Sequence, residues 1–196
     1  TVYDNAKELE DHLEAFLTQD YESEYEVIVV DESSSDNTDD VLKLFKQKYS
    51  HLYTTFLPKP NKNKIRKKLA LTIGVKAAKY EWVIFSDIHY FPKSNSWLKE
   101  LSENLDFQSD ITLGYFKKED IRLQTFEDLN GARKHIIKAE RASSDGHRGK
   151  RLRYTRGIYD FISVKKEHAH ETLSFFENKP GWWRLMGLRL CVILNK

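Results

Sequence analysis

The chain has 196 residues, 32 of them basic and 30 acidic, and a formal net charge of +2. This balance gives no reason to expect nucleic acid as a partner. A hydrophobic share of 40% with 13% aromatic residues excludes a disordered chain and is typical of a globular domain. The single cysteine, Cys191, excludes an internal disulfide and a cysteine-rich zinc site. No uncharged apolar run is long enough to span a bilayer.

Apolar residues recur with two different periods along the chain. Spacing of three and four residues predicts amphipathic helices, and short continuous runs of β-branched residues predict strands that are buried on both faces. In chain order, the predicted elements are a helix at 6–19, a strand at 27–30, a helix at 39–49, a strand at 51–57, a helix at 67–78, a strand at 82–86, a helix at 94–105 and a strand at 111–115. The alternation predicts an α/β sandwich with a mainly parallel sheet.

Two of the predicted strands end on acids. The strand at 27–30 runs into Asp31, followed by a turn rich in Ser, Asp, Asn and Thr. The strand at 82–86 runs into Asp87, and His89 projects to the same side of an extended backbone. Ligands of α/β proteins bind at the carboxyl edge of the sheet. A carboxylate and an imidazole on one side of a strand end can share a divalent cation.

Four motifs in this order resemble those of bacterial family 2 glycosyltransferases of the GT-A fold. Those enzymes typically carry P-V-Y-N, I-I-V-V-D-D-G-S-S-D-N-T, K-x-x-A-L-N-x-G-I-x-x-A and D-A-D-x-x-x-P. The matching segments are residues 1–5, 27–38, 67–77 and 87–92, so the resemblance covers nearly half of the chain. It implies a GT-A α/β/α sandwich whose first strand is truncated, because residues 1–3 match only the end of that strand.

The resemblance also implies a domain organisation. We expect a GT-A domain at 1–180, with a nucleotide-binding half at 1–92 and an acceptor half at 93–180. Residues 181–196 are apolar with paired Trp and two Arg, which favours an amphipathic interfacial helix at a membrane. A C-terminal helix packed on the domain is the alternative.

The family's motifs assign roles to individual residues. By this resemblance, Thr1, Tyr3 and Asp31 bind the nucleotide, and Lys67 contacts the phosphates. Asp87 and His89 hold a divalent cation, Mn²⁺ or Mg²⁺, and the imidazole in place of a second carboxylate favours Mn²⁺.

The acceptor half departs from the family's pattern. Family members usually carry a Glu-Asp pair whose acid is the general base, and this chain has none after Gly157, which leaves Asp160 as the candidate base. Two basic stretches, residues 59–68 and 133–156, either contact phosphates, an anionic acceptor or lipid headgroups, or form a solvated surface.

The function implied by the resemblance is hexosyl transfer, with inversion, from a nucleotide-diphosphate-sugar to an acceptor hydroxyl. A UDP-sugar is the favoured donor, and a carbohydrate or lipid-linked molecule is the expected acceptor. The expected setting is envelope polysaccharide or glycolipid synthesis, in the cytoplasm at the inner face of the bacterial plasma membrane. A catalytically inactive nucleotide-sugar-binding or scaffolding protein is the alternative. A nucleotidyltransferase has the same α/β layout, but it would need a Gly-rich phosphate-binding loop near the N-terminus, and residues 1–5 contain no Gly.

Overall fold

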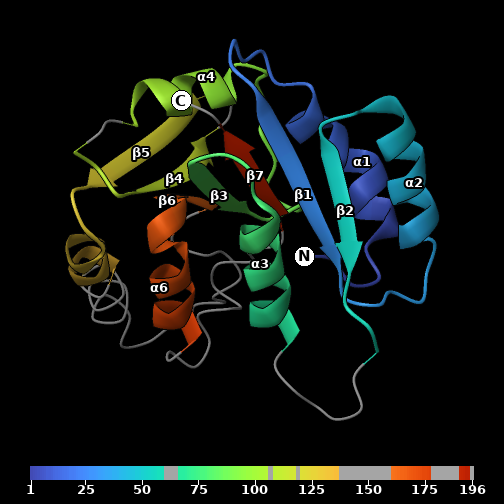
Figure 1. The fold of residues 1–196 in the computed structure, drawn as a ribbon. Coiled ribbons are helices and arrows are strands. Elements are labelled where there is room, and N and C mark those ends of the chain that lie inside the picture. Colours follow the sequence, from blue (N-terminus) through green and yellow to red (C-terminus); the bar gives the residue numbers. More distant parts are fainter. Residues whose placement is uncertain (60–65, 106–107, 118–119, 137–159, 178–189, 195–196) are drawn as a thin grey trace, which may run out of the picture.

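The computed structural model describes residues 1–59, 66–105, 108–117, 120–136, 160–177 and 190–194 (Figure 1). Its elements are α1 (Ala6–Leu17), β1 (Tyr25–Asp31), α2 (Thr38–Lys48), β2 (Leu52–Phe56), α3 (Arg66–Ala77), β3 (Trp82–Ser86), α4 (Trp97–Glu103), β4 (Ile111–Lys117), β5 (Asp120–Phe126), β6 (Phe161–Lys165), α6 (Lys166–Glu177) and β7 (Leu190–Leu194). Residues 129–136 are also helical. The helices and strands predicted between residues 6 and 115 are all present, with shifted ends.

One seven-stranded sheet forms the centre of the molecule, in the order β2-β1-β7-β3-β6-β4-β5. Strands β1, β2, β3 and β4 run in one direction, and β5, β6 and β7 run in the other. The predicted α/β architecture is confirmed. The sheet is mixed because β6 and β7, which the sequence did not reveal, lie antiparallel beside β3, and because the short connection from β4 to β5 allows only an antiparallel pair.

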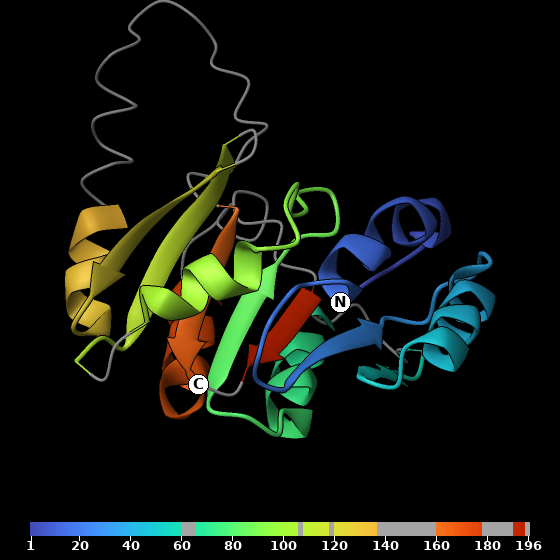
Figure 2. The same ribbon diagram turned by 90° about the horizontal axis from the view of Figure 1, so that it is seen from above.

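Helices cover both faces of this sheet (Figures 1 and 2). Helices α1, α2 and α4 pack on one face, whereas α3, α6 and the helix at 129–136 pack on the other. Strand β1 contributes side chains to the cores on both faces of the sheet. Val27 and Val29 pack with α1, α2 and α4, and Ile28 and Val30 pack on the opposite face with α3 and α6. These four side chains are at most 1% exposed, so the prediction of a strand buried on both faces is confirmed.

The C-terminal residues differ from the expectation. Instead of an interfacial helix, residues Leu190–Leu194 form strand β7, hydrogen-bonded between β1 and β3. Residues 181–189, with the paired Trp, lie outside the described part of the chain. In the residues that the structure describes, no helix combines the length and hydrophobicity needed to cross a bilayer.

The start of the chain lies beside the end of β1. Val2 forms a parallel bridge with Asp31: the Val2 N–H donates to the Val30 carbonyl at 2.9 Å, and the Glu32 N–H donates to the Val2 carbonyl at 2.8 Å. Strand β7 pairs with β1 only as far as Ile28. The two segments therefore share one position in the sheet, and Tyr3 emerges at the carboxyl end of β1.

Candidate active site

Three predicted site acids lie at one rim of the sheet. Strands β1 and β3 run in the same direction, so Asp31 at the end of β1 and Asp87 just after β3 lie at the same edge. Strand β6 runs the opposite way, and Phe161 at its start pairs with Ser86. Asp160, one residue earlier, therefore lies at this edge beside Asp87. Asp31 and Asp87 stand two strand positions apart, about 10 Å between strand axes.

A tight turn holds the Asp31 carboxylate. Its Oδ1 accepts hydrogen bonds from the Ser34 N–H at 3.0 Å and from the Ser34 hydroxyl at 2.6 Å. Ser33 adopts φ 68°, in the left-handed region that favours glycine, and its hydroxyl donates to the Leu57 carbonyl. Ser33 stands where the resembled motif has Gly, so this chain builds the same turn with a strained residue.

The N-terminal segment is tied to the same turn. The Asp4 carboxylate, on a residue with φ 50°, accepts from the Ser35 N–H at 2.7 Å. The Asp36 carboxylate accepts from the Ala6 N–H at 3.0 Å and from the Thr38 N–H at 3.0 Å. Burial raises the pKa of Asp36, but the hydrogen bonds from Thr38 and Ala6 outweigh it, so the pKa lies below its usual value of 3.8. The ionised form of Asp36 thus fixes the entry to α1.

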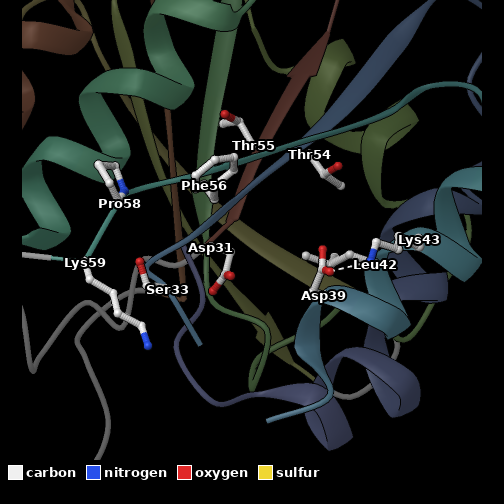
Figure 3. Close-up of a pocket in the computed structure, with 10 residues that line it drawn as sticks. All are labelled: Asp31, Ser33, Asp39, Leu42, Lys43, Thr54, Thr55, Phe56, Pro58 and Lys59. Atoms are coloured by element: carbon white, nitrogen blue, oxygen red, sulfur yellow. Dashed lines mark ion pairs between the residues drawn. The ribbon is translucent and has the colours of Figure 1, made fainter. Parts of the chain in front are cut away.

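A cavity of about 440 Å³ opens beside this turn, between β2 and α2 (Figure 3). Its lining includes a carboxylate, hydroxyl groups and the aromatic ring of Phe56, which is 70% exposed. Asp39 and Lys43 form an ion pair at 2.5 Å on its α2 side. The lining residues are Asp31, Ser33, Asp39, Leu42, Lys43, Thr54, Thr55, Phe56, Pro58 and Lys59. Asp87 and His89 do not line this cavity. They share with Asp31 one rim of the sheet, but not one closed pocket.

The two predicted metal ligands contact each other. The Asp87 side chain is buried, and its Oδ1 accepts from the His89 N–H at 3.0 Å and lies 2.8 Å from His89 Nδ1. The other ring nitrogen, Nε2, faces Glu8 Oε1 of α1 at 3.7 Å. Within the described residues, no group of three or more His, Cys, Asp or Glu side chains is arranged to hold a metal ion. The predicted pair is therefore adjacent but is not a complete ligand set.

The candidate base is held by its neighbours in the sheet. The Asp160 N–H donates to the Gly114 carbonyl at 2.9 Å, and Asp160 Oδ2 accepts from the Phe116 N–H at 2.8 Å. Asp160 is only partly buried. Its position is thus set by backbone contacts to β4, next to Asp87.

The other predicted nucleotide and phosphate contacts differ in their exposure to solvent and in whether the structure describes them. Tyr3 is 54% exposed at the rim, whereas Thr1 is 3% exposed with its hydroxyl buried, so of these two side chains only that of Tyr3 is open to solvent. Lys67 is the second residue of α3, and its side chain lies outside the described part of the structure, as do residues 60–65 and 137–156 of the two basic stretches. The approach of Glu8 to His89 could not be predicted from the sequence, because Glu8 has the pattern of any acid on the solvated face of a helix.

Comparison with known proteins identifies the family. The model of glycosyl transferase family 2 matches residues 1–165. The chain belongs to this family. The predicted GT-A fold is supported by a mannosyltransferase from Pyrobaculum calidifontis, solved with GDP-Man and Mn²⁺. That structure is 16% identical, with a TM-score of 0.57, over 87% of this chain and 44% of its own.

Two further proteins are similar to this chain over part of their length. A poly(ribitol-phosphate) beta-glucosyltransferase of Bacillus spizizenii is 29% identical over 117 residues, which is 59% of this chain and 18% of that protein. The crystal structure of residues 1–349 of TarS from S. aureus is 25% identical, with a TM-score of 0.48, over 56% of this chain and 32% of its own. The chain therefore spans less than half of each of these three proteins.

Proposed function

We propose that this family 2 domain transfers a sugar from a nucleotide-diphosphate donor to an acceptor hydroxyl, with inversion at the anomeric carbon. The observation that supports it most is the meeting of Asp31, Asp87 and Asp160 at one carboxyl rim, although they are far apart in sequence. Binding at this rim is the general rule for open α/β sheets.

The nucleotide lies at the β1 end of the rim. An ionised Asp31 only accepts hydrogen bonds, so it suits the N–H of a uracil or guanine base or a ribose hydroxyl. Tyr3 offers an exposed ring beside it for stacking. Lys59, which lines the neighbouring cavity, and Lys67, at the start of α3, supply positive charge for the diphosphate. A UDP-sugar is the donor that we expect.

Asp87 and His89 would hold a divalent cation at the β3 end of the rim. A carboxylate and an imidazole suit Mn²⁺, and Mg²⁺ sites in phosphate-transferring proteins take one or two carboxylates and complete their shell with substrate phosphates and water. An incomplete protein ligand set therefore fits such a group. When bound, the cation would offset the negative charge that develops on the leaving diphosphate.

Asp160 is the general base in this proposal. It lies beside Asp87 at the rim, where it would take the proton of the acceptor hydroxyl as the acceptor oxygen attacks the anomeric carbon. The hydrogen bond from the Phe116 N–H to Oδ2 keeps the carboxylate oriented. A single displacement opposite the leaving diphosphate inverts the configuration of the sugar.

The acceptor that we propose is a carbohydrate or lipid-linked polymer of the bacterial envelope. The name of the Bacillus spizizenii relative, which acts on poly(ribitol-phosphate), supports this choice. We place the protein in the cytoplasm, at the inner face of the bacterial plasma membrane.

A donor screen tests the proposal. UDP-, GDP- and dTDP-sugars are added with and without Mn²⁺, and both the thermal midpoint and the release of nucleoside diphosphate are recorded. We expect one nucleotide class to raise the midpoint and to be hydrolysed or transferred, and Asp87→Ala to abolish turnover. Stabilisation without turnover would favour the alternative, a catalytically inactive nucleotide-sugar-binding protein. No stabilisation by any donor would contradict both.

A further inference from the structure

The ring of Phe56 lies beside the Asp31 carboxylate. Phe56 ends β2, and the sheet register pairs it with Asp31 at the end of β1. Paired residues of neighbouring strands point to the same face of a sheet, and such strands lie about 4.8 Å apart. Both side chains line the cavity between β2 and α2 (Figure 3). Phe56 is also the most exposed large hydrophobic residue in the described part of the chain, so its ring is open to a ligand.

Asp31 has one carboxylate oxygen left for a ligand. Its Oδ1 accepts two hydrogen bonds, one from the N–H and one from the hydroxyl of Ser34. A carboxylate oxygen has two acceptor positions, so both positions of Oδ1 are filled. Among the residues that the structure describes, none donates a hydrogen bond to Oδ2. A bound molecule therefore meets a single open oxygen, with an aromatic ring next to it.

We propose that Phe56 stacks on a uracil base whose N3–H donates to Asp31 Oδ2. The edge of the uracil ring carries this one N–H, so a single carboxylate oxygen satisfies it. Guanine presents its N1–H and N2–H side by side, and that pair needs both oxygens of a carboxylate. Because Ser34 occupies Oδ1, guanine would keep one donor unpaired, which lowers its affinity. Thymine has the same N3–H as uracil, so the contact selects these two pyrimidines over guanine.

Affinity and selectivity come from different residues in this arrangement. Every base has a π face, so Phe56 would strengthen the binding of any nucleotide, and Asp31 supplies the discrimination between bases. Val2 pairs with Asp31 along the edge of β1 that is opposite to β2. Tyr3 and Phe56 therefore flank the end of β1, and the base has an aromatic residue on each side.

This inference rests on the proposed function, because it requires that a nucleotide binds at this rim. It adds a residue outside the four motifs of the family, since Phe56 lies between the segments at 27–38 and 67–77. In the order of the sheet, β1 stands between β2 and β3. A base that lies over Phe56 therefore leaves the diphosphate on the β3 side of Asp31, toward Asp87.

Isothermal titration calorimetry with the 196-residue chain tests the assignment, in Mn²⁺ and again in EDTA. The ligands are UDP, GDP and N3-methyl-UDP, which is UDP without the N3–H. We expect UDP to bind at least about fivefold more tightly than either of the other two. Phe56→Ala should weaken UDP binding at least about fivefold, whereas Phe56→Tyr keeps a ring and should bind UDP as the unchanged chain does. The matched control is Tyr53→Ala, which removes an exposed ring from the other face of β2 and should leave UDP affinity unchanged.

The outcomes separate this inference from the proposed function. UDP affinity of Phe56→Ala within about twofold of the unchanged chain would overturn the stacking role of Phe56. GDP or N3-methyl-UDP binding as tightly as UDP would overturn the contact to Asp31 Oδ2. Both results leave the proposed function intact, because a nucleotide still binds. If none of the three ligands bound, with or without Mn²⁺, the inference and the proposed function would both be contradicted. Matching circular dichroism spectra confirm that the variants are folded.

Discussion

Replacing Gly114 with Ala should destabilise the domain severely, because the Phe161 ring occupies the space of the new methyl group. A Cβ at Gly114 would lie 2.1, 2.5 and 2.8 Å from three ring atoms of Phe161. Carbon atoms in contact lie about 3.5–4.0 Å apart, so the ring would have to withdraw by about 1.4 Å. Phe161 is fully buried, and Trp97 and Phe116 pack against its ring with centroids 5.4 and 5.2 Å away.

The ring therefore has no free space, and the cost should lie at the upper end of that for overpacked cores, about 3 kcal/mol. With a urea m-value of about 2 kcal/mol/M, the unfolding midpoint should fall by about 1.5 M. Urea titration followed by circular dichroism measures it. Because the Gly114 carbonyl accepts the Asp160 N–H, the same change should displace the candidate base and lower turnover.

A double-mutant cycle isolates the clash. Phe161→Leu alone should cost about 1–2 kcal/mol, and the pair should cost about 2 kcal/mol less than the sum of the single changes. The matched control is Gly131→Ala, whose Cβ would have its nearest neighbour at 3.4 Å, in a helical turn. It should leave stability unchanged or raise it by up to about 1 kcal/mol. A Gly114→Ala cost below about 1 kcal/mol would refute the seating of Phe161 on Gly114.

Three further predictions concern the turn and its supports. Asp36→Asn should lower the thermal midpoint at pH 7. Because the pKa of Asp36 is lower in the folded chain than its usual value, the ionised carboxylate stabilises the fold, and the difference from the unchanged chain should vanish as the pH falls below 3.8. A difference that is constant with pH would contradict this. Ser33→Gly should be about 1–2 kcal/mol more stable than Ser33→Ala in urea titrations, because both lack the hydroxyl and only Ala keeps the strain of φ 68°; equal stabilities would argue against a left-handed residue. Gln19→Leu should cost about 1–3 kcal/mol, because the buried Leu98 N–H loses its acceptor Gln19 Oε1 at 3.1 Å; an unchanged midpoint would show that this N–H has another partner.

The local sequence predicted the strand ends of the site well. Continuous β-branched runs report burial on both faces, and the acid that ends such a run must lie at the carboxyl rim. The positions of Asp31 and Asp87 follow from that rule and are confirmed. The strain at Ser33 was equally visible in principle, since the resembled motif has Gly at this position.

Long-range pairing is what the sequence could not show. Asp160 lies at the same rim as Asp87 only because β6 runs antiparallel to β3, and the start of β6 has no local signal for its partner. The same is true of β7, because the apolar pattern of residues 190–194 alone favours part of an interfacial helix. Glu8 contacts His89 through helix packing, and a polar residue on a helix face is indistinguishable from a solvated one before the fold is known.

The central claim is that one rim of the sheet binds the nucleotide and the cation together. Crystals grown with UDP and Mn²⁺ test it most directly through the anomalous difference map. We predict a manganese peak beside His89 and Asp87, with the uracil base of UDP against Asp31 and Tyr3. A manganese peak elsewhere, or a nucleotide bound away from this rim, would contradict the account.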